Sequence, residues 1–225
     1  MIPTLPGPPD YVFDLGAADR GEALVGIGGN LSPATLLEAY CTGVFPMGAG
    51  PRGGPPLGWW CPDPRGILRL GDLRVSRSLR RSMRRFDFTV DEAFEAVLAG
   101  CADPAREGAW ITPEIGAAYL QLHRLGWAHS VEVWSAGDLV GGLYGVAVGG
   151  LFAGESMFHR VTDASKAALV VLVDLLADDG DPRRFVDVQW LTAHLATLGG
   201  CEVSRPDYLA LLRQALRAPL PAPWT

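Results

Sequence analysis

The stretch SVEVWSAGDLVGGLYGVAVGGLFAGESMF, residues 130–158, decides the fold of this chain. Residues 130–134 alternate polar and apolar side chains, which is the pattern of a half-buried strand. A turn is predicted at residues 136–138, and two further strands follow that break near Gly149 and Gly150. Strands joined by such short turns predict an antiparallel meander.

Helices are predicted before and after this meander. Capping residues and helix stops indicate helices over residues 33–41, 76–86, 91–99, 113–125 and 163–176. Ser32 is the expected N-cap of the first helix, and Asp163 that of the last. Strands are expected at residues 185–189 and 201–203, with short helices beside the second. The sequence therefore predicts an α+β fold with a mixed, mainly antiparallel sheet.

A change in composition divides the chain near Cys61. Residues 1–31 predict extended chain and turns, and residues 48–58 predict a linker because they are rich in Gly and Pro. We therefore expect a small N-terminal domain over residues 1–61 and a larger domain over residues 62–225.

The composition is that of a globular protein, since 48% of the 225 residues are hydrophobic and 20% are charged. Residues 1–6 lack the features of a signal peptide, and the weakly polar residues 139–154 hold too many glycines for a lipid-spanning helix. We expect a cytoplasmic protein without a membrane span. The cysteines and histidines lack zinc-site spacings, so free thiols and no metal or cofactor are predicted.

One face of the helix predicted at residues 76–86 is strongly basic, although the net charge of the chain is -6. On a helical wheel, Leu79, Met83 and Phe86 share one arc. The opposite arc holds Arg77, Arg80, Arg81, Arg84 and Arg85. Arginines without interleaved acids repel one another, which favours a bound phosphate over the alternative of a solvated surface.

Acidic and amide side chains appear where the pattern predicts buried strand. Glu155 interrupts the last strand of the meander, while Asp187 and Gln189 lie two apart and are expected to share a strand face. A structural ion pair and a functional site both explain this pattern. Common hydrolase, P-loop, metalloprotease and dinucleotide motifs are absent from the sequence.

Several short motifs spread along the chain match one family of enzymes. They lie at residues 28–33, 43–46, 59–65, 107–112, 129–134, 141–146 and 152–158. Through them the chain resembles the bacterial leucyl/phenylalanyl-tRNA-protein transferases over nearly its whole length. The resemblance implies a C-terminal domain with the fold of the GNAT acetyltransferases. It also implies transfer of Leu, Phe or Met from aminoacyl-tRNA to proteins that begin with Arg or Lys, which marks them for degradation.

The resemblance assigns substrate-binding roles to individual residues. Arg77, Arg84 and Arg85 match a basic cluster for the tRNA acceptor stem, and Trp110 matches an aromatic that holds the terminal adenosine. Tyr119 is also expected to contact substrate. Two positions differ from the family. Met47 stands where an adenosine-binding Trp is frequent but is still expected to pack on the base, and Thr192 replaces an Asn. The amino-acid side chain is expected to enter a pocket formed by Leu143, Phe152, Met157, Leu169, Leu172 and Leu176.

Such a pocket suits side chains unbranched at Cβ, although each of its residues also fits an ordinary core. Gln189 matches the residue that handles the proton in the family. Because an amide is a weak proton acceptor, we predict that Gln189 orients the attacking amine while Asp187 polarises the pair. Glu155 is predicted to hold part of the adenosine or the cationic N-terminus of the acceptor.

Two other functions remain open at this point, and a monomer is expected in each case. A CoA-dependent N-acetyltransferase has a related fold, but its pyrophosphate loop is not matched by residues 160–165, and Asp163 would repel a pyrophosphate. A noncatalytic RNA-binding module explains the arginines but leaves Glu155, Asp187 and Gln189 without a role.

Overall fold

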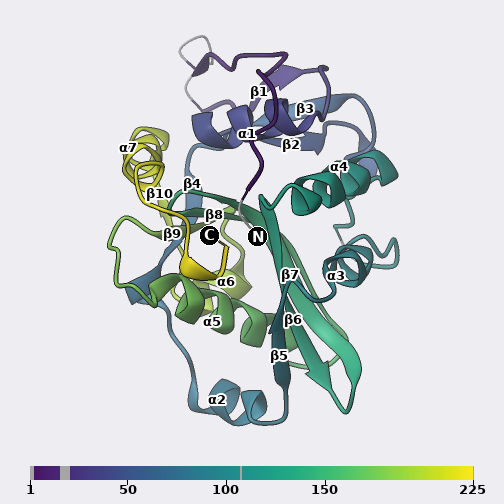
Figure 1. Ribbon diagram of the computed structural model, residues 1–225, viewed down its shortest axis with the longest axis vertical. Helices are drawn as coiled ribbons and strands as arrows, with labels where there is room; N and C mark the ends of the chain where they lie inside the picture. Colours follow the sequence, from purple (N-terminus) through teal and green to yellow (C-terminus); the bar gives the residue numbers. More distant parts are fainter. Residues whose placement is uncertain (1–2, 16–20, 107, 225) are drawn as a thin grey trace.

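Two β-sheets form the framework of the protein (Figure 1). The structure is a computed structural model that describes residues 3–15, 21–106 and 108–224. Glu107, which belongs to one of the motifs above, lies outside the described residues, as do residues 1–2, 16–20 and 225 of the two predicted domains.

The helices and strands follow one another in mixed order. They are β1 (Leu24–Ile27), α1 (Pro33–Thr42), β2 (Phe45–Gly48), η2 (Pro51–Gly53), β3 (Leu57–Trp60), β4 (Arg65–Arg69), η3 (Leu70–Asp72), α2 (Arg77–Met83), β5 (Asp87–Val90), α3 (Phe94–Cys101), α4 (Pro113–Arg124), β6 (Ala128–Ser135), β7 (Asp138–Val148), β8 (Leu151–His159), α5 (Ala164–Ala177), β9 (Phe185–Gln189), α6 (Ala193–Thr197), β10 (Cys201–Val203), α7 (Arg205–Ala215) and η4 (Ala222–Trp224).

The large sheet has seven strands in the order β10-β4-β9-β8-β7-β6-β5. Strands β6, β7 and β8 form the predicted antiparallel meander, and β8 and β9 are parallel. The other neighbours in this sheet are antiparallel. The predicted mixed, mainly antiparallel sheet is confirmed.

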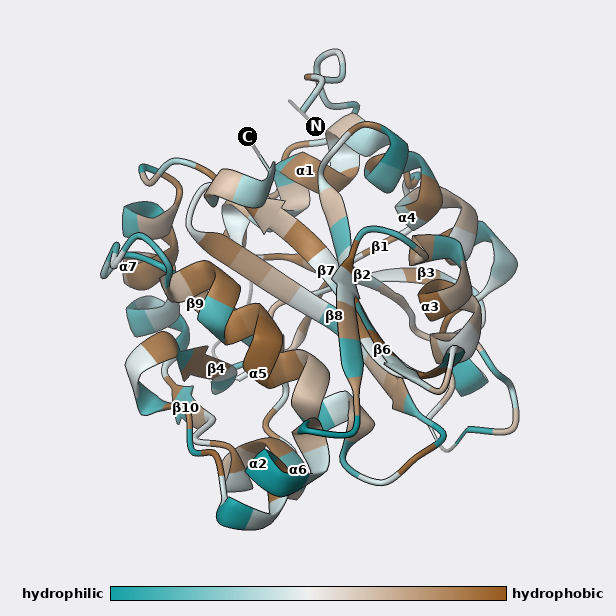
Figure 2. Ribbon diagram, turned by 60° about the horizontal axis from the view of Figure 1, so that its bottom comes forward, coloured by the Kyte–Doolittle hydropathy of each residue, from teal (hydrophilic) through white to brown (hydrophobic). Residues whose placement is uncertain are grey.

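Helices cover both faces of the large sheet. The apolar helix α5 packs against β6, β7 and β8 on one face, and α3 and α4 lie on the other (Figures 1 and 2). Nine residues of α5 are buried, because its apolar side chains occupy almost all sides of the helix. No helix among the described residues is long and apolar enough to cross a membrane.

The small sheet, in the order β1-β3-β2, contains the segment that was predicted as a linker. That prediction is wrong, because residues 48–58 connect β2 to β3 and include the start of β3. Glycine is required there for close approach: a Cβ on Gly48 would lie 1.8 Å from the Gly53 carbonyl oxygen. The core residues Tyr40 and Trp59 of this region share one hydrophobic cluster with Tyr144 of the large sheet. The predicted division at residues 61 and 62 stays a prediction.

Local caps explain which predicted helices begin where expected. Ser32 Oγ accepts a hydrogen bond from the Thr35 N–H and caps α1. The helix expected from residue 91 begins only at Phe94, because Asp91 adopts a positive φ of 61° and its carboxylate accepts the Ser130 N–H. Asp163 stands at the N-cap of α5 but does not cap it, because its carboxylate accepts hydrogen bonds from Ser82 and Lys166 instead.

Candidate active site

A cavity of about 440 Å³ opens where the parallel strands β8 and β9 separate. Their register ends with the pair Ala153 and Asp187. The residues that follow this pair in the chain, 154–157 and 188–190, line the cavity together with side chains of α5 and α6. The cavity therefore lies at a gap between β8 and β9. Residues near both ends of β8, the last strand of the meander, line it.

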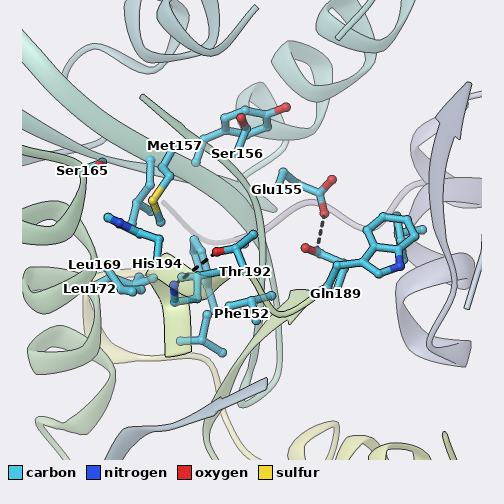
Figure 3. Close-up of a pocket in the computed structure, with 18 of the residues that line it drawn as sticks. Phe152, Glu155, Ser156, Met157, Ser165, Leu169, Leu172, Gln189, Thr192 and His194 are labelled. Carbon is cyan, nitrogen blue, oxygen red and sulfur yellow. Dashed lines mark hydrogen bonds between the residues drawn. The ribbon is translucent and has the colours of Figure 1, made fainter. Parts of the chain in front are cut away.

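Apolar side chains form one end of the cavity. Five residues predicted for the amino-acid pocket line it, namely Leu143, Phe152, Met157, Leu169 and Leu172. Met157, Leu169 and Leu172 lie on the side away from Glu155 and Gln189 (Figure 3). Leu176 does not line the cavity; it lies two turns beyond Leu169 on α5 and is buried in the core. Val186 and Val188 of β9, which were not predicted, complete this surface.

Glu155 forms the polar end. Its Oε1 accepts a hydrogen bond from Tyr40 at 2.8 Å, and its Oε2 accepts one from Tyr119 at 2.6 Å. Gln189 Nε2 donates to Oε1 at 3.5 Å, and the two side chains face each other in Figure 3. Tyr119, predicted to touch substrate, lies behind the cavity wall and acts on it through Glu155.

Burial raises the pKa of Glu155 to about 7, and the nearby Asp187 charge adds to this, whereas the two phenols act in the opposite direction. Burial and the Glu155 carboxylate also raise the pKa of Tyr40 and Tyr119, so both phenols keep their protons. The phenol oxygens lie 2.6 Å apart. Three contacts join oxygen atoms here: one between the two phenols and one from each phenol to Glu155. The two phenols supply only two protons, so a proton on Glu155 completes the third hydrogen bond. Glu155 can therefore gain or lose a proton near neutral pH.

Asp187 lies behind the wall of the cavity and is held by an ion pair. Arg65 Nε and Nη2 donate to its two carboxylate oxygens at 2.9 and 2.7 Å, and both side chains are 1% exposed. Tyr208 also donates to it at 2.9 Å. The sequence did not point to Arg65, Tyr208 or Tyr40, because each comes from an element distant in the chain.

Gln189 lines the cavity, whereas Asp187 does not. Gln189 ends β9 with a positive φ of 57°. The Asp187 Oδ1 accepts the backbone N–H of Gln189 at 3.0 Å. Its contact with Gln189 is thus to the backbone and not to the amide group predicted to be polarised.

Aromatic residues and Met47 surround the cavity on the side of the small sheet. Trp110 and Met47, both predicted for adenosine binding, line it together with Phe45 and Trp190. Trp190 is 41% exposed, which is unusual for a tryptophan, and its ring lies at 87° to that of Phe45 with centroids 5.1 Å apart. Thr192 also lines the cavity, and it caps α6. An exposed aromatic face beside a cavity is suited to stacking on a base.

The cavity also has histidines that were dismissed as metal ligands from the sequence. His159 Nδ1 lies 3.4 Å from Ser165 Oγ, and His194 lines the same region. Burial, followed by the charge of Lys166, lowers the pKa of His194, so its ring is neutral at pH 7. Among the described residues, no group of three or more His, Cys, Asp or Glu side chains could hold a metal ion.

The arginine face of α2 is exposed, as predicted. Leu79 and Phe86 are buried, whereas Arg77, Arg84 and Arg85 are exposed. Helix α2 lies at the end of the molecule away from the small sheet (Figure 1), and Figure 2 shows that it combines hydrophilic and hydrophobic residues. Ser82 Oγ donates to Asp163 at 2.8 Å, which connects α2 to the start of α5.

Comparison with known proteins assigns this arrangement to one group of enzymes. The family model for leucyl/phenylalanyl-tRNA protein transferase matches residues 67–213, and the model for its N-terminal domain matches residues 29–63. A leucyl/phenylalanyl-tRNA–protein transferase of Aromatoleum aromaticum is 48% identical over 230 residues, which cover 100% of this chain and 95% of the relative. One from Nitratidesulfovibrio vulgaris is 51% identical over 210 residues, covering 89% and 88%.

Among solved structures, a GCN5-related N-acetyltransferase-like protein from Streptococcus suis has a TM-score of 0.34 and 14% identity, covering 77% of this chain and 66% of that one. This likeness is too weak to define the fold.

Proposed function

This chain belongs to the leucyl/phenylalanyl-tRNA protein transferase family, and we propose that its cavity transfers Leu, Phe or Met from aminoacyl-tRNA to proteins that begin with Arg or Lys. The enzyme is an aminoacyltransferase. One observation carries the assignment of the site: the Glu155 carboxyl group, held by two phenols and the Gln189 amide, lies at one end of a cavity whose other end is apolar.

The apolar end is proposed to bind the side chain of the donor amino acid. Leu169 and Leu172 on α5 and Met157 on β8 offer flexible, unbranched-at-Cβ surfaces that adapt to Leu, Phe or Met. The terminal adenosine is proposed to lie beside Trp110 and Met47, where aromatic and thioether groups can pack against a base.

The polar end is proposed to bind the α-amine of the acceptor. An α-ammonium has a pKa of about 8, so its proton passes readily to a carboxylate of similar proton affinity. Glu155 takes that proton, and Gln189 orients the neutral amine. The amine nitrogen then forms a bond to the ester carbonyl carbon, and the bond from that carbon to the ribose oxygen breaks. The second proton of the nitrogen goes to the departing ribose oxygen.

Asp187 is proposed to act as a positioning residue in this reaction. Its carboxylate fixes the Gln189 backbone while Arg65 and Tyr208 fix the carboxylate. In this proposal Asp187 does not polarise the Gln189 amide, as was predicted. It holds the backbone at the end of β9, from which the Gln189 side chain projects.

The arginine face of α2 is proposed to bind the acceptor stem of the tRNA, through Arg77, Arg84 and Arg85. These exposed guanidinium groups form no ion pair with the described residues. Reversing the charge at Arg84 and Arg85 is expected to raise the KM for aminoacyl-tRNA about tenfold. The KM for a minimal aminoacyl-adenosine donor, which has no acceptor stem, is expected to stay unchanged. An equal loss on both donors would count against a contact with the stem.

We expect a monomer that works in the cytoplasm, where it marks proteins for degradation.

The test of the proposed function is transfer itself. The protein is incubated with labelled Leu-, Phe- and Met-tRNA and peptides that differ only in a first residue of Arg, Lys or Ala. Label is expected on the Arg and Lys peptides alone, and incorporation from acetyl-CoA instead would overturn the proposal. Binding of tRNA without transfer would support an RNA-binding module.

A further inference from the structure

Phe152, one wall of the apolar end of the cavity, is backed by an aromatic ring from the end of the chain. Trp224 in η4 stacks on Phe152, with ring centroids 5.5 Å apart and an angle of 27° between the planes. Phe152 lines the cavity, whereas Trp224 does not and is 1% exposed. Trp224 therefore contacts one wall of the cavity from behind, through the ring of Phe152.

A second set of contacts fixes Trp224 in place. His129 stacks on the indole with centroids 4.2 Å apart and an angle of 13°. His129 Nδ1 lies 2.7 Å from Asp91 Oδ2, and Asp91 Oδ1 accepts the Ser130 N–H at 2.8 Å. A continuous series of contacts thus runs from the β5–β6 edge of the sheet through His129 and Trp224 to the cavity wall.

The ring of Phe152 is also confined by the neighbouring strand β7. A Cβ on Gly145 would lie 2.5 Å from Phe152 Cε1, so the ring occupies space that only a glycine leaves free. With Gly145 and Trp224 both against it, the ring has little freedom to withdraw from the cavity. Its position sets how much room the apolar end offers.

We propose that Trp224 is a positioning residue that sets the depth of the donor pocket through Phe152 and thereby the relative use of Phe and Leu. This deepens the proposed function and rests on it. Replacing the indole by a smaller group leaves space behind Phe152, and the ring moves into that space because cores relax partly around a cavity. The pocket then becomes larger, which favours the larger donor.

The test compares kcat/KM for Phe-tRNA and Leu-tRNA in the full-length protein with one Arg-starting peptide. The ratio is used because the fraction of folded enzyme cancels from it. Trp224→Leu is expected to raise the Phe/Leu ratio about tenfold, and Trp224→Phe about threefold, in line with the cost of one or two methylene groups in an apolar pocket. If Trp224→Leu does not fold, Trp224→Phe decides the question.

Trp59→Leu is the matched control. Trp59 is 3% exposed and packs against Phe13 with ring centroids 4.7 Å apart and planes tilted by 56°, but it does not line the cavity. The control is expected to lose stability and to keep the wild-type ratio. A ratio unchanged in both Trp224 variants, or changed equally in the control, would overturn the inference. Absence of transfer from every donor by the wild-type protein would instead contradict the proposed function.

Discussion

The polar end of the cavity and the ion pair behind it each contain one buried or half-buried carboxyl group. The two carboxyl groups differ in the charge of the side chains that bind them. Glu155 accepts hydrogen bonds from two neutral phenols and an amide and is in no ion pair among the described residues, and burial raises its pKa to about 7 although the phenols and the charge of Arg65 act in the opposite direction. Asp187 meets the guanidinium of Arg65 on both oxygens. Neutral donors thus surround the carboxyl group at the cavity, whereas a guanidinium forms a buried ion pair with the carboxyl group behind it.

The largest effect is expected from breaking the ion pair. Arg65→Met leaves the Asp187 charge buried without its partner and should lower the free energy of unfolding by about 3–5 kcal/mol. Urea unfolding followed by circular dichroism measures this. The double variant Arg65→Met/Asp187→Leu removes both charges and should recover at least half of the loss. A single-variant loss below about 1 kcal/mol would contradict the assigned role of the pair.

Neutralising Glu155 should raise the free energy of unfolding, whereas Arg65→Met lowers it. Its pKa in the folded protein is about 7, above the value of about 4.3 in an unfolded chain, so its contribution is favourable at low pH and is lost as pH rises from about 4 to 7. Glu155→Gln should therefore be more stable than wild type at pH 8, by roughly 1–3 kcal/mol. The difference should shrink toward pH 4.

Glu95→Gln is the matched control for this comparison, because Glu95 lies exposed on α3. Urea unfolding at several pH values should show little change for that variant. If Glu155→Gln were no more stable than Glu95→Gln at pH 8, the Glu155 carboxylate would carry no burial cost.

A smaller change is expected from one phenol. The Tyr119 hydrogen bond lowers the pKa of Glu155, so Tyr119→Phe should raise that pKa by about one unit. The pH dependence of kcat/KM should then move to higher pH by a similar amount. Tyr208→Phe removes a buried hydroxyl that bonds Asp187 and should leave the midpoint in place. An equal shift in both variants would contradict the separation of the two regions.

The sequence predicts the elements whose signals are local. The meander, α1 with its Ser32 cap, and α4 between Thr112 and Gly126 depend on neighbouring residues, and all are found. Strand β4 was missed because its pairing with β9 depends on residues far away in the chain. Residues 48–58 were wrongly predicted as a linker because their Gly and Pro content does not show that the strands on either side pair.

The candidate site shows the same division. Glu155 and Gln189 stand out in the sequence as polar residues in apolar strands, and the family resemblance assigns them to the active site. Tyr40 is brought to Glu155 from α1, and Arg65 to Asp187 from β4, which no local pattern indicates. The positive φ of 57° at Gln189 has no signal in the sequence either.

The pH dependence of transfer from Phe-tRNA to an Arg-starting peptide tests most directly whether Glu155 is the titrating group of the site. In the wild-type enzyme, kcat/KM should rise through a pKa of about 7 in addition to the rise near 8 that belongs to the free α-amine of the peptide. In Glu155→Gln the first rise should disappear and the second should remain. The kcat/KM of this variant should be at least about 100-fold below that of the wild-type enzyme. Persistence of the rise near 7 in Glu155→Gln would contradict this role of Glu155.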